Sequence, residues 1–416
     1  MTGGHLYLWP AAAPRRSRGN AMMRRAQGLL LVLALLLPSA AARADATPIQ
    51  IVWLALANTQ RVPSTMLEPP PTDEGVQGAR VALAENVTTG RFTGQAWSLE
   101  EEVGADEAGV LAAFRAAYAS GRRLFVAALP APLLLKVADL PEARDALILD
   151  AADADDSLRA EDCRRNLLHT LPSRAMLADA LMQYLVVKSW TRVLLVTGPQ
   201  PADKLLAAAF RQSAKKFRLK LVDDKPWTFV EGARRSDTGH FAVEAEVARF
   251  TQGIGYDILV VADEANDFAY ELPYHATDPR PVAGSAGMVP TAWSGIFEQW
   301  GATQLQLRFR KAAGRKMTAL DYGAWMAMRT FGEAATRAQS ADPAIIAAFI
   351  RGKDFELAAF KGSRLSFRAW DGQLRQPVLL VDPHELVSVS PQPGFLSQFS
   401  ELDTLGVDQP ETKCHL

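Results

Sequence analysis

Two short groups of polar residues in this 416-residue sequence each follow an apolar run of strand type, where a ligand could be held. Amide and hydroxyl groups at the end of a strand can hydrogen-bond a small ligand, and carboxylates can pair with an ammonium or guanidinium group or help to hold a metal complex. An ordinary turn is the alternative interpretation of both groups. The first group is Asn58, Thr59 and Gln60, and the second is Asp263 and Glu264.

A third polar group is the acidic segment DAADADDSLRAED, which begins at Asp150. Counted from Asp153, it starts like a calcium-binding loop, with acidic or hydroxyl residues at the first, third and fifth positions. The sixth position is Leu158 where such loops need glycine, and the twelfth is Arg164 where they need glutamate, so an EF-hand is excluded. A solvated loop is the simpler interpretation. The carboxylates that remain candidates for a cation in another geometry are Asp153, Asp155 and Asp156.

Motifs of known catalytic chemistry are absent from the sequence. There is no GxxxxGK[ST] phosphate loop, no GxSxG nucleophile turn, no HExxH zinc motif and no CxxC pair. The six histidines lack metal-ligand spacing, and the Gly253-x-Gly255 pair precedes an expected strand, whereas a dinucleotide fingerprint follows one. We therefore expect a protein that is not an enzyme, carries no cofactor and binds a ligand.

The composition is that of a globular chain with no affinity for nucleic acid. Hydrophobic residues make up 49% and charged residues 22%, which is enough apolar material for two packed lobes. The formal net charge of −1 offers no basic excess to bind a phosphate backbone. Residues 1–44 hold six arginines and no acid, so the rest of the chain carries 39 basic against 46 acidic residues and is moderately acidic.

The N-terminus has the order of a secretory signal. Arg24 and Arg25 precede an apolar run over 28–37, and small residues follow up to Ala44, after which we expect cleavage. The run has about ten residues, whereas a membrane-spanning helix needs roughly 20. An uncleaved anchor is the alternative. The sequence therefore predicts export.

After export the two cysteines, Cys163 and Cys414, would be in an oxidising compartment, where they can form a disulfide. Two cysteines are too few for a disulfide scaffold, but they suffice for one bridge. Such a bridge would tie the C-terminal tail to the middle of the chain. The alternative is a pair of free thiols.

Strand and helix patterns alternate along the body of the chain. Repeated strand–helix–strand units predict parallel sheets with right-handed crossovers. The alternation occurs twice, before about residue 168 and again over about 172–290, so we expect an α/β fold of two lobes with a cleft between them. Strands are expected at 49–56, 124–129, 147–149, 192–197, 219–222 and 257–261, and helices at 75–85, 106–119, 174–188, 201–217, 243–251, 319–338 and 343–351.

This order of elements resembles the type I periplasmic solute-binding proteins of the branched-chain amino-acid group. More narrowly, it resembles the subgroup encoded with dehydrogenase systems for alcohols that depend on pyrroloquinoline quinone (PQQ). The segments that carry the family resemblance are GARVALA (78–84), NLLHTLPS (166–173), LDYGAW (320–325), FKG (360–362) and LSF (365–367). Those that carry the narrower one are DSLR (156–159), CRRN (163–166), WDGQLRQP (370–377) and ELDTLG (401–406).

The resemblance implies two Rossmann-like lobes with parallel central sheets, joined by a hinge of three crossovers. It also implies that the chain captures a small molecule in the periplasm and delivers it to an ABC permease driven by its ATPase. A periplasmic sensor or accessory protein of the dehydrogenase system, and a protein that binds a metal or metal chelate, are the alternatives. The implied boundaries are 1–44 for the signal peptide, 45–168 with 291–338 for lobe 1, 172–290 with 342–390 for lobe 2, and 391–416 for the tail.

The loops that should hold the ligand differ from those of amino-acid binders in the family. The loops at 128–132 and 151–153 lack the small hydroxyl residues that hold an amino acid, and 198–200 lacks the expected tyrosine. We therefore do not expect an α-amino-acid pocket. The further ligand candidates are Ala151, Asp153 and Gln200 in these loops, and Trp293 as a cleft aromatic.

Overall fold

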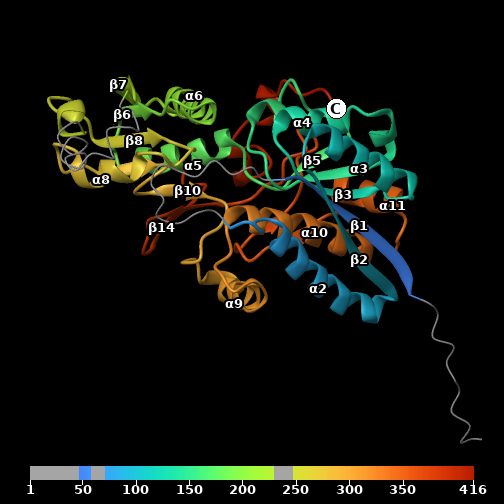
Figure 1. The fold of residues 1–416 in the computed structure, drawn as a ribbon. Coiled ribbons are helices and arrows are strands. Elements are labelled where there is room, and N and C mark those ends of the chain that lie inside the picture. Colours follow the sequence, from blue (N-terminus) through green and yellow to red (C-terminus); the bar gives the residue numbers. More distant parts are fainter. Residues whose placement is uncertain (1–45, 58–70, 229–246) are drawn as a thin grey trace, which may run out of the picture. The chain divides into compact units, whose positions relative to one another are not determined.

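A computed structural model describes residues 46–57, 71–228 and 247–416 of the chain (Figure 1). By their contacts the residues fall into two units, 1–45 and 46–416, and the following description concerns the second. The expected signal peptide, the group Asn58, Thr59 and Gln60, and the first part of the expected helix 243–251 lie outside the described residues. No helix in the described ranges is long and apolar enough to cross a bilayer.

The first sheet has five parallel strands in the order β2-β1-β3-β4-β5. Ile49, Ile51 and Trp53 of β1 belong to the core that α2 and α10 complete on one face, whereas Val52 and Leu54 pack under α3 and α4 on the other. Successive strand residues point to opposite faces, so burial on both faces requires the continuous apolar run of β1. The elements are β1 (Thr47–Leu56), α2 (Val76–Thr93), β2 (Gln95–Gly104), α3 (Glu107–Ala119), β3 (Leu124–Ala128), α4 (Ala131–Ala138), β4 (Leu147–Asp150), β5 (Leu167–His169) and α10 (Ala319–Arg337).

The second sheet has four parallel strands in the order β7-β6-β8-β9. Helices α5 and α6 cover one face, and a smaller apolar cluster with Trp227 and Phe268 covers the other. Ser173 begins α5 because its side chain accepts a hydrogen bond from the backbone N–H of Met176. The elements are α5 (Arg174–Val187), β6 (Arg192–Thr197), α6 (Pro201–Lys216), β7 (Lys220–Pro226), β8 (Ile258–Ala262) and β9 (Val282–Gly284). The predicted α/β class with parallel central sheets is thus confirmed.

Three passes of the chain connect the two parallel sheets. The first runs from β5 to α5, and the second from β9 through β10 (Val289–Thr291) to α9 (Ala302–Ala313). Leu305 and Phe309 of α9 belong to the core of the first sheet. The third pass follows α10 and leads to β13 (Val378–Val381).

Strand β13 packs into the cores of both parallel sheets. It lies between β10 and β14 (Leu386–Ser390) in a three-stranded antiparallel sheet. Leu379 and Val381 belong to the core of the first sheet, and Val378 and Leu380 to that of the second. Because the side chains of a strand alternate between its faces, one short strand can join two cores.

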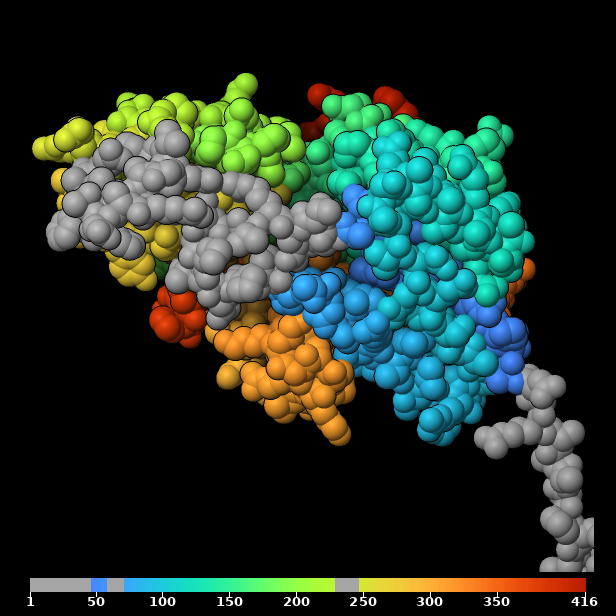
Figure 2. Space-filling model, in the orientation of Figure 1, coloured from blue at the N-terminus to red at the C-terminus, as the bar shows by residue number. Residues whose placement is uncertain are grey.

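Short elements fill the connections between these layers. They are α8 (Leu272–His275), α11 (Pro343–Arg351), β11 (Leu357–Ala358), β12 (Arg364–Leu365) and the 3₁₀ turns η1 (Pro141–Asp145), η2 (Asp156–Arg159), η4 (Ala269–Glu271), η5 (Gln299–Gly301), η6 (Glu401–Thr404) and η7 (Gln409–Glu411). In Figure 2 the surface of α9 (orange) adjoins that of α2 (blue), and a shallow groove of about 300 Å³ lies between these two helices.

The C-terminal tail is held against the body of the protein at several points. A disulfide joins Cys163 and Cys414, the pairing that the sequence left open. The guanidinium of Arg368 donates to the carboxylate of Asp403 (Nε–Oδ1 2.9 Å), and Asp179 of α5 accepts the backbone N–H of Gly406 (2.9 Å). The tail is therefore an ordered part of the structure.

Helices α2 and α10 approach each other closely at Gly78. A Cβ atom at this position would lie 1.8 Å from the backbone oxygen of Asp321. Further along the pair, Asn86 donates from its side chain to the backbone oxygen of Met328 (2.9 Å). The glycine in the GARVALA segment thus permits the contact that returns α10 to the first sheet.

We expect Gly78→Ala to lower the free energy of unfolding by about 1–3 kcal/mol, because an added methyl forces the two helices apart. The measurement is urea unfolding followed by circular dichroism. Gly295→Ala is the matched control, since Gly295 is exposed. A Cβ atom there would have the flexible Lys316 side chain as its nearest neighbour, at 3.4 Å. Equal stability of the two variants would contradict the tight contact.

Candidate functional site

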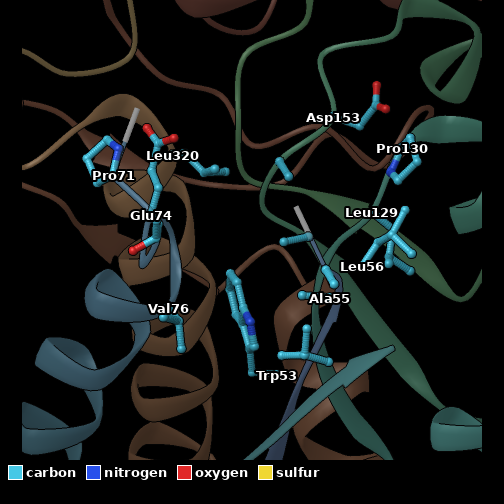
Figure 3. A pocket seen from close by; sticks show the side chains of 15 residues that line it. Trp53, Ala55, Leu56, Pro71, Glu74, Val76, Leu129, Pro130, Asp153 and Leu320 are labelled. Carbon is cyan, nitrogen blue, oxygen red and sulfur yellow. The ribbon is translucent and has the colours of Figure 1, made fainter. Parts of the chain in front are cut away.

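A hollow of about 450 Å³ lies at the carboxyl end of the first sheet (Figure 3). Its walls come from the ends of β1, β3 and β4, from the turn that precedes α2, and from Leu320 at the start of α10. The carboxyl ends of neighbouring parallel strands meet at one edge of a sheet, which is the usual place for a ligand. The volume fits a small molecule, because such sites measure about 300–1,000 Å³.

Trp53 of β1 forms the base of the hollow. It is 3% exposed, and its indole lies between the turn that carries Glu74 and the strand end at Ala55 (Figure 3). Gly75 in that turn has a φ of 83°, and a Cβ atom there would lie 2.8 Å from the indole. Only glycine combines this backbone conformation with so close an approach. The contact ties β1 to the turn.

Glu74 lies on one side of the hollow and is partly buried. Burial raises the pKa of Glu74, and the charge of Asp321 raises it further, while a hydrogen bond with Thr318 opposes the rise. The guanidinium of Arg315 also opposes the rise, but it is bonded to Asp73 (Nε–Oδ1 3.0 Å) and to Asp321 (Nη1–Oδ2 2.6 Å). Glu74 therefore forms no ion pair with any residue of the described ranges.

Asp153 lies on the other side, after β4 (Figure 3). Its carboxylate accepts the backbone N–H of Ala131 (2.6 Å), which is the first residue of α4, and that of Asp155 (2.7 Å). Burial raises the pKa of Asp153, and the charge of Asp150 adds to this effect, although Arg159 and the two N–H donors oppose it. The backbone bonds hold the carboxylate in a fixed orientation.

Asp150, which acts on Asp153, lies in a buried polar network behind the hollow. Its carboxylate contacts Nδ1 of His169 at 2.9 Å, and both side chains are fully enclosed. Burial and the charge of Arg159 lower the pKa of His169 to about 4, so the imidazole is neutral at pH 7. His169 therefore provides no positive charge to balance that of Asp150.

The other acidic candidates of the same segment are occupied by the backbone. Asp155 accepts the N–H of Ser157 (3.0 Å), and Asp156 accepts that of Ala175 (2.9 Å). Burial raises the pKa of Asp156. Within the described ranges, no group of three or more His, Cys, Asp or Glu residues could hold a metal ion. The arrangement gives the metal alternative no support.

The candidates after β6 and β8 are not among the described residues that line the hollow. The carboxylate of Asp263 accepts three backbone N–H groups, from Asp267, Phe268 and Ala269, and so begins η4. Glu264 accepts two hydrogen bonds from Arg174 (2.6 and 2.7 Å), and Gln200 caps α6. Their role as ligand-binding residues stays a prediction.

The structure places Trp293, which was expected as the cleft aromatic, in the core, and Trp53 in the lining of the hollow. Trp293 is 3% exposed and stacks on Tyr322 with ring centres 4.3 Å apart, inside the core of the first sheet. Ala151 is also buried in that core, while Ala152 and Asp153 line the hollow.

Glu74 was not predicted from the sequence. The sequence shows it only as an acid directly before the glycine at which a helix begins.

Of the comparisons with known proteins, only the one with solved structures gives matches. The sequence matches no protein-family model and none of the curated proteins. Solved structures do match. A branched-chain amino-acid ABC transporter periplasmic ligand-binding protein from Burkholderia xenovorans superposes with a TM-score of 0.67 at 14% identity, over 88% of this chain and 99% of that chain.

The chain has the fold of the type I periplasmic binding proteins. A second such structure is the closed conformation of a leucine-, isoleucine-, valine-, threonine- and alanine-binding protein from Brucella ovis (TM-score 0.61, 16% identity, 80% of this chain and 89% of that chain). A third is an ABC transporter solute-binding protein from R. palustris in complex with benzoate (TM-score 0.61, 11% identity, 89% of this chain and 100% of that chain).

The raised pKa of Glu74 has a consequence for stability in this periplasmic binding fold. A carboxyl whose pKa is higher in the folded state binds its proton more tightly there, so its ionisation destabilises the fold. Relative to Glu74→Gln, the wild-type free energy of unfolding should therefore fall as the pH rises from about 4, the unfolded pKa range, towards neutrality. Urea unfolding of both proteins at several pH values measures the difference. If the difference in free energy of unfolding instead shifts in favour of the wild type as the pH rises, the burial of an unpaired charge is contradicted.

Proposed function

We propose that this protein is the periplasmic substrate-binding component of an ABC uptake transporter and that it performs no catalysis. The observation that carries the proposal is the hollow at the carboxyl end of the first parallel sheet, in a chain whose fold is that of periplasmic binding proteins. Strand ends and helix-preceding turns supply its walls, as expected for a site that encloses a small molecule.

The proposed mechanism is closure of two lobes on the ligand. Lobe 1 comprises 45–168 with 291–338, lobe 2 comprises 172–290 with 342–390, and 391–416 form the tail. A ligand can favour closure only through the contacts that it makes in the closed state and not in the open one. The three passes between the sheets are the segments at which such a movement would be taken up, and the Brucella ovis protein provides a precedent for a closed state.

The proposal includes export by the signal peptide at 1–44 and delivery of the ligand to an ABC permease and its ATPase at the inner membrane. It also includes the narrower resemblance, by which the ligand belongs to the metabolism of alcohols oxidised by PQQ-dependent dehydrogenases. Deleting the gene tests this link. The deletion strain should grow more slowly on alcohols and normally on succinate, and equal growth on both would remove the link.

Binding at the hollow can be tested by filling it. The residue to change is Ala152, which lines the hollow, and a phenylalanine there would occupy the ligand's space. We expect Ala152→Phe to weaken binding at least about tenfold, a loss of roughly 1.4 kcal/mol. The ligand is first identified by native mass spectrometry of protein from its own periplasm, and affinity is then measured by calorimetry.

Two controls accompany this experiment. Ala116→Phe changes an exposed residue on α3 and should leave affinity unchanged. A ligand present at about 100 times its Kd should stabilise the wild-type fold by about 2.7 kcal/mol and make it more compact in small-angle scattering. Binding without compaction would contradict lobe closure, and unchanged affinity of Ala152→Phe would place the ligand elsewhere.

A further inference from the structure

Among the described residues that line the hollow, the charged groups all have one sign. Among the fifteen lining residues, the ionisable ones are Glu74 and Asp153, and lysine, arginine and histidine are missing from this set. The two carboxylates come from different parts of the fold, one from the turn before α2 and one from the loop after β4. Figure 3 shows them on opposite sides, beyond the indole of Trp53.

Two arginines whose charges act on these carboxylates, Arg315 and Arg159, are bonded to other groups, and a third, Arg174, pairs with Glu264. Arg315 is bonded to Asp73 and Asp321, and the guanidinium of Arg159 donates to the backbone oxygens of Asp153 and Asp155 (both 2.9 Å). Around Glu74 there are thus three carboxylates, counting Glu74 itself, Asp73 and Asp321, against one guanidinium. The field in this part of the hollow is negative.

Both carboxylates are arranged to accept further hydrogen bonds. Asp153 uses one acceptor site of each oxygen for a backbone N–H. A carboxylate has about four acceptor sites, so each can receive a donor from a ligand. Because the two backbone N–H groups already fix the side chain of Asp153, binding would require little ordering of that carboxylate.

The rest of the lining is apolar. Trp53, Leu129, Val76 and Leu320 surround the space between the two acids. Such a surface accommodates a hydrocarbon or aromatic skeleton, and the face of an aromatic ring also attracts a cation. The lining therefore matches a ligand with an apolar body and a positive group.

We propose that the ligand of this hollow is a small organic cation, an amine in its ammonium form, whose charge is attracted by the carboxylates of the lining, Glu74 and Asp153, and whose carbon skeleton packs on Trp53. The proposal rests on the proposed function and specifies its ligand class. A carboxylate ligand such as the benzoate of the R. palustris protein would meet two like charges here, and an amino acid would leave its carboxylate without a cationic partner in the described lining. An ammonium offers N–H donors and a charge opposite to that of both acids.

Matched probes that differ only in the polar group test this inference. One series is benzylammonium, benzyl alcohol and benzoate, and a second is butylammonium, butanol and butyrate. Affinities are measured by calorimetry at pH 7 on the full mature protein. We expect the ammonium compound of at least one series to bind at least about tenfold more tightly than its alcohol and its carboxylate, a difference of roughly 1.4 kcal/mol.

Isosteric variants identify the groups responsible. Glu74→Gln and Asp153→Asn should each weaken binding of the ammonium probe, by about tenfold or more at the carboxylate that the ammonium contacts, because each removes one of the two negative charges of the described lining. Glu385→Gln, at an exposed carboxylate away from the hollow, should leave affinity unchanged. Circular dichroism checks that each variant is folded. Asp153 holds two backbone N–H groups, so Asp153→Asn carries the greater risk to folding, and Glu74→Gln serves if that variant fails to fold.

The possible outcomes separate this inference from the proposed function. If an alcohol or a carboxylate binds as tightly as its ammonium counterpart, or if no ammonium compound binds, the ligand class is wrong. In that case a co-purified molecule of another class that compacts the protein would leave the proposed function intact. If no probe and no co-purified molecule binds, both proposals fail.

Discussion

The arrangement of the candidate site depends on one buried carboxylate, that of Asp321. It accepts the backbone N–H of Gly75 (Oδ1, 2.8 Å), closes the capping box of α10 with Thr318, and pairs with Arg315. Its own backbone oxygen lies where Gly78 leaves room. A single side chain thus fixes the turn before α2 to the start of α10, although the two are about 240 residues apart.

Glu74 sits in that turn, so its position follows from the same contacts. Thr318, which is oriented by Asp321, is also one of the side chains that act on the pKa of Glu74. Because Arg315 is engaged by Asp73 and Asp321, it does not neutralise the acid that faces the hollow. The negative field of the site is therefore a consequence of how α10 is anchored, and a change at Asp321 would affect both the fold and the site.

One strand and the C-terminal tail together hold the two parallel sheets to each other. Strand β13 places alternate side chains in two cores, and the tail adds polar contacts to α5 through Asp179 and Gln183. The disulfide from Cys414 returns the tail to Cys163 in the loop before β5. Any relative movement of the two sheets must therefore be accommodated by a few residues in the three connecting passes.

The fold could be predicted from the sequence where the signal was local. The apolar runs of β1, β6 and β8 and the cap at Ser173 were sufficient for strands and a helix. Helix α4 was missed because Pro130 and Pro132 were interpreted as the end of a strand, whereas a proline at the first positions favours a helix. Strand β2 was missed because it lies at the edge of the sheet and carries three glutamates.

The candidate site was less predictable because its residues meet only in three dimensions. Asp153 was identified from its loop, but Glu74 and Leu320 reach the hollow through the packing of α10 on α2, which leaves no local pattern. Polar residues at a strand end do not reveal whether they face a ligand or cap a turn, as Asp263 does. Likewise, the sequence favoured Trp293 as the cleft aromatic, whereas Trp293 lies in the core and Trp53 lines the hollow.

The most direct test of the account is a crystal structure of the protein grown with benzylammonium. We predict electron density for the ligand at the carboxyl end of the first sheet, with its nitrogen within hydrogen-bond distance of the carboxylate of Glu74 or of Asp153 and its ring against Trp53. Density beside Asp263 and Glu264, or an empty hollow at saturating ligand, would contradict it.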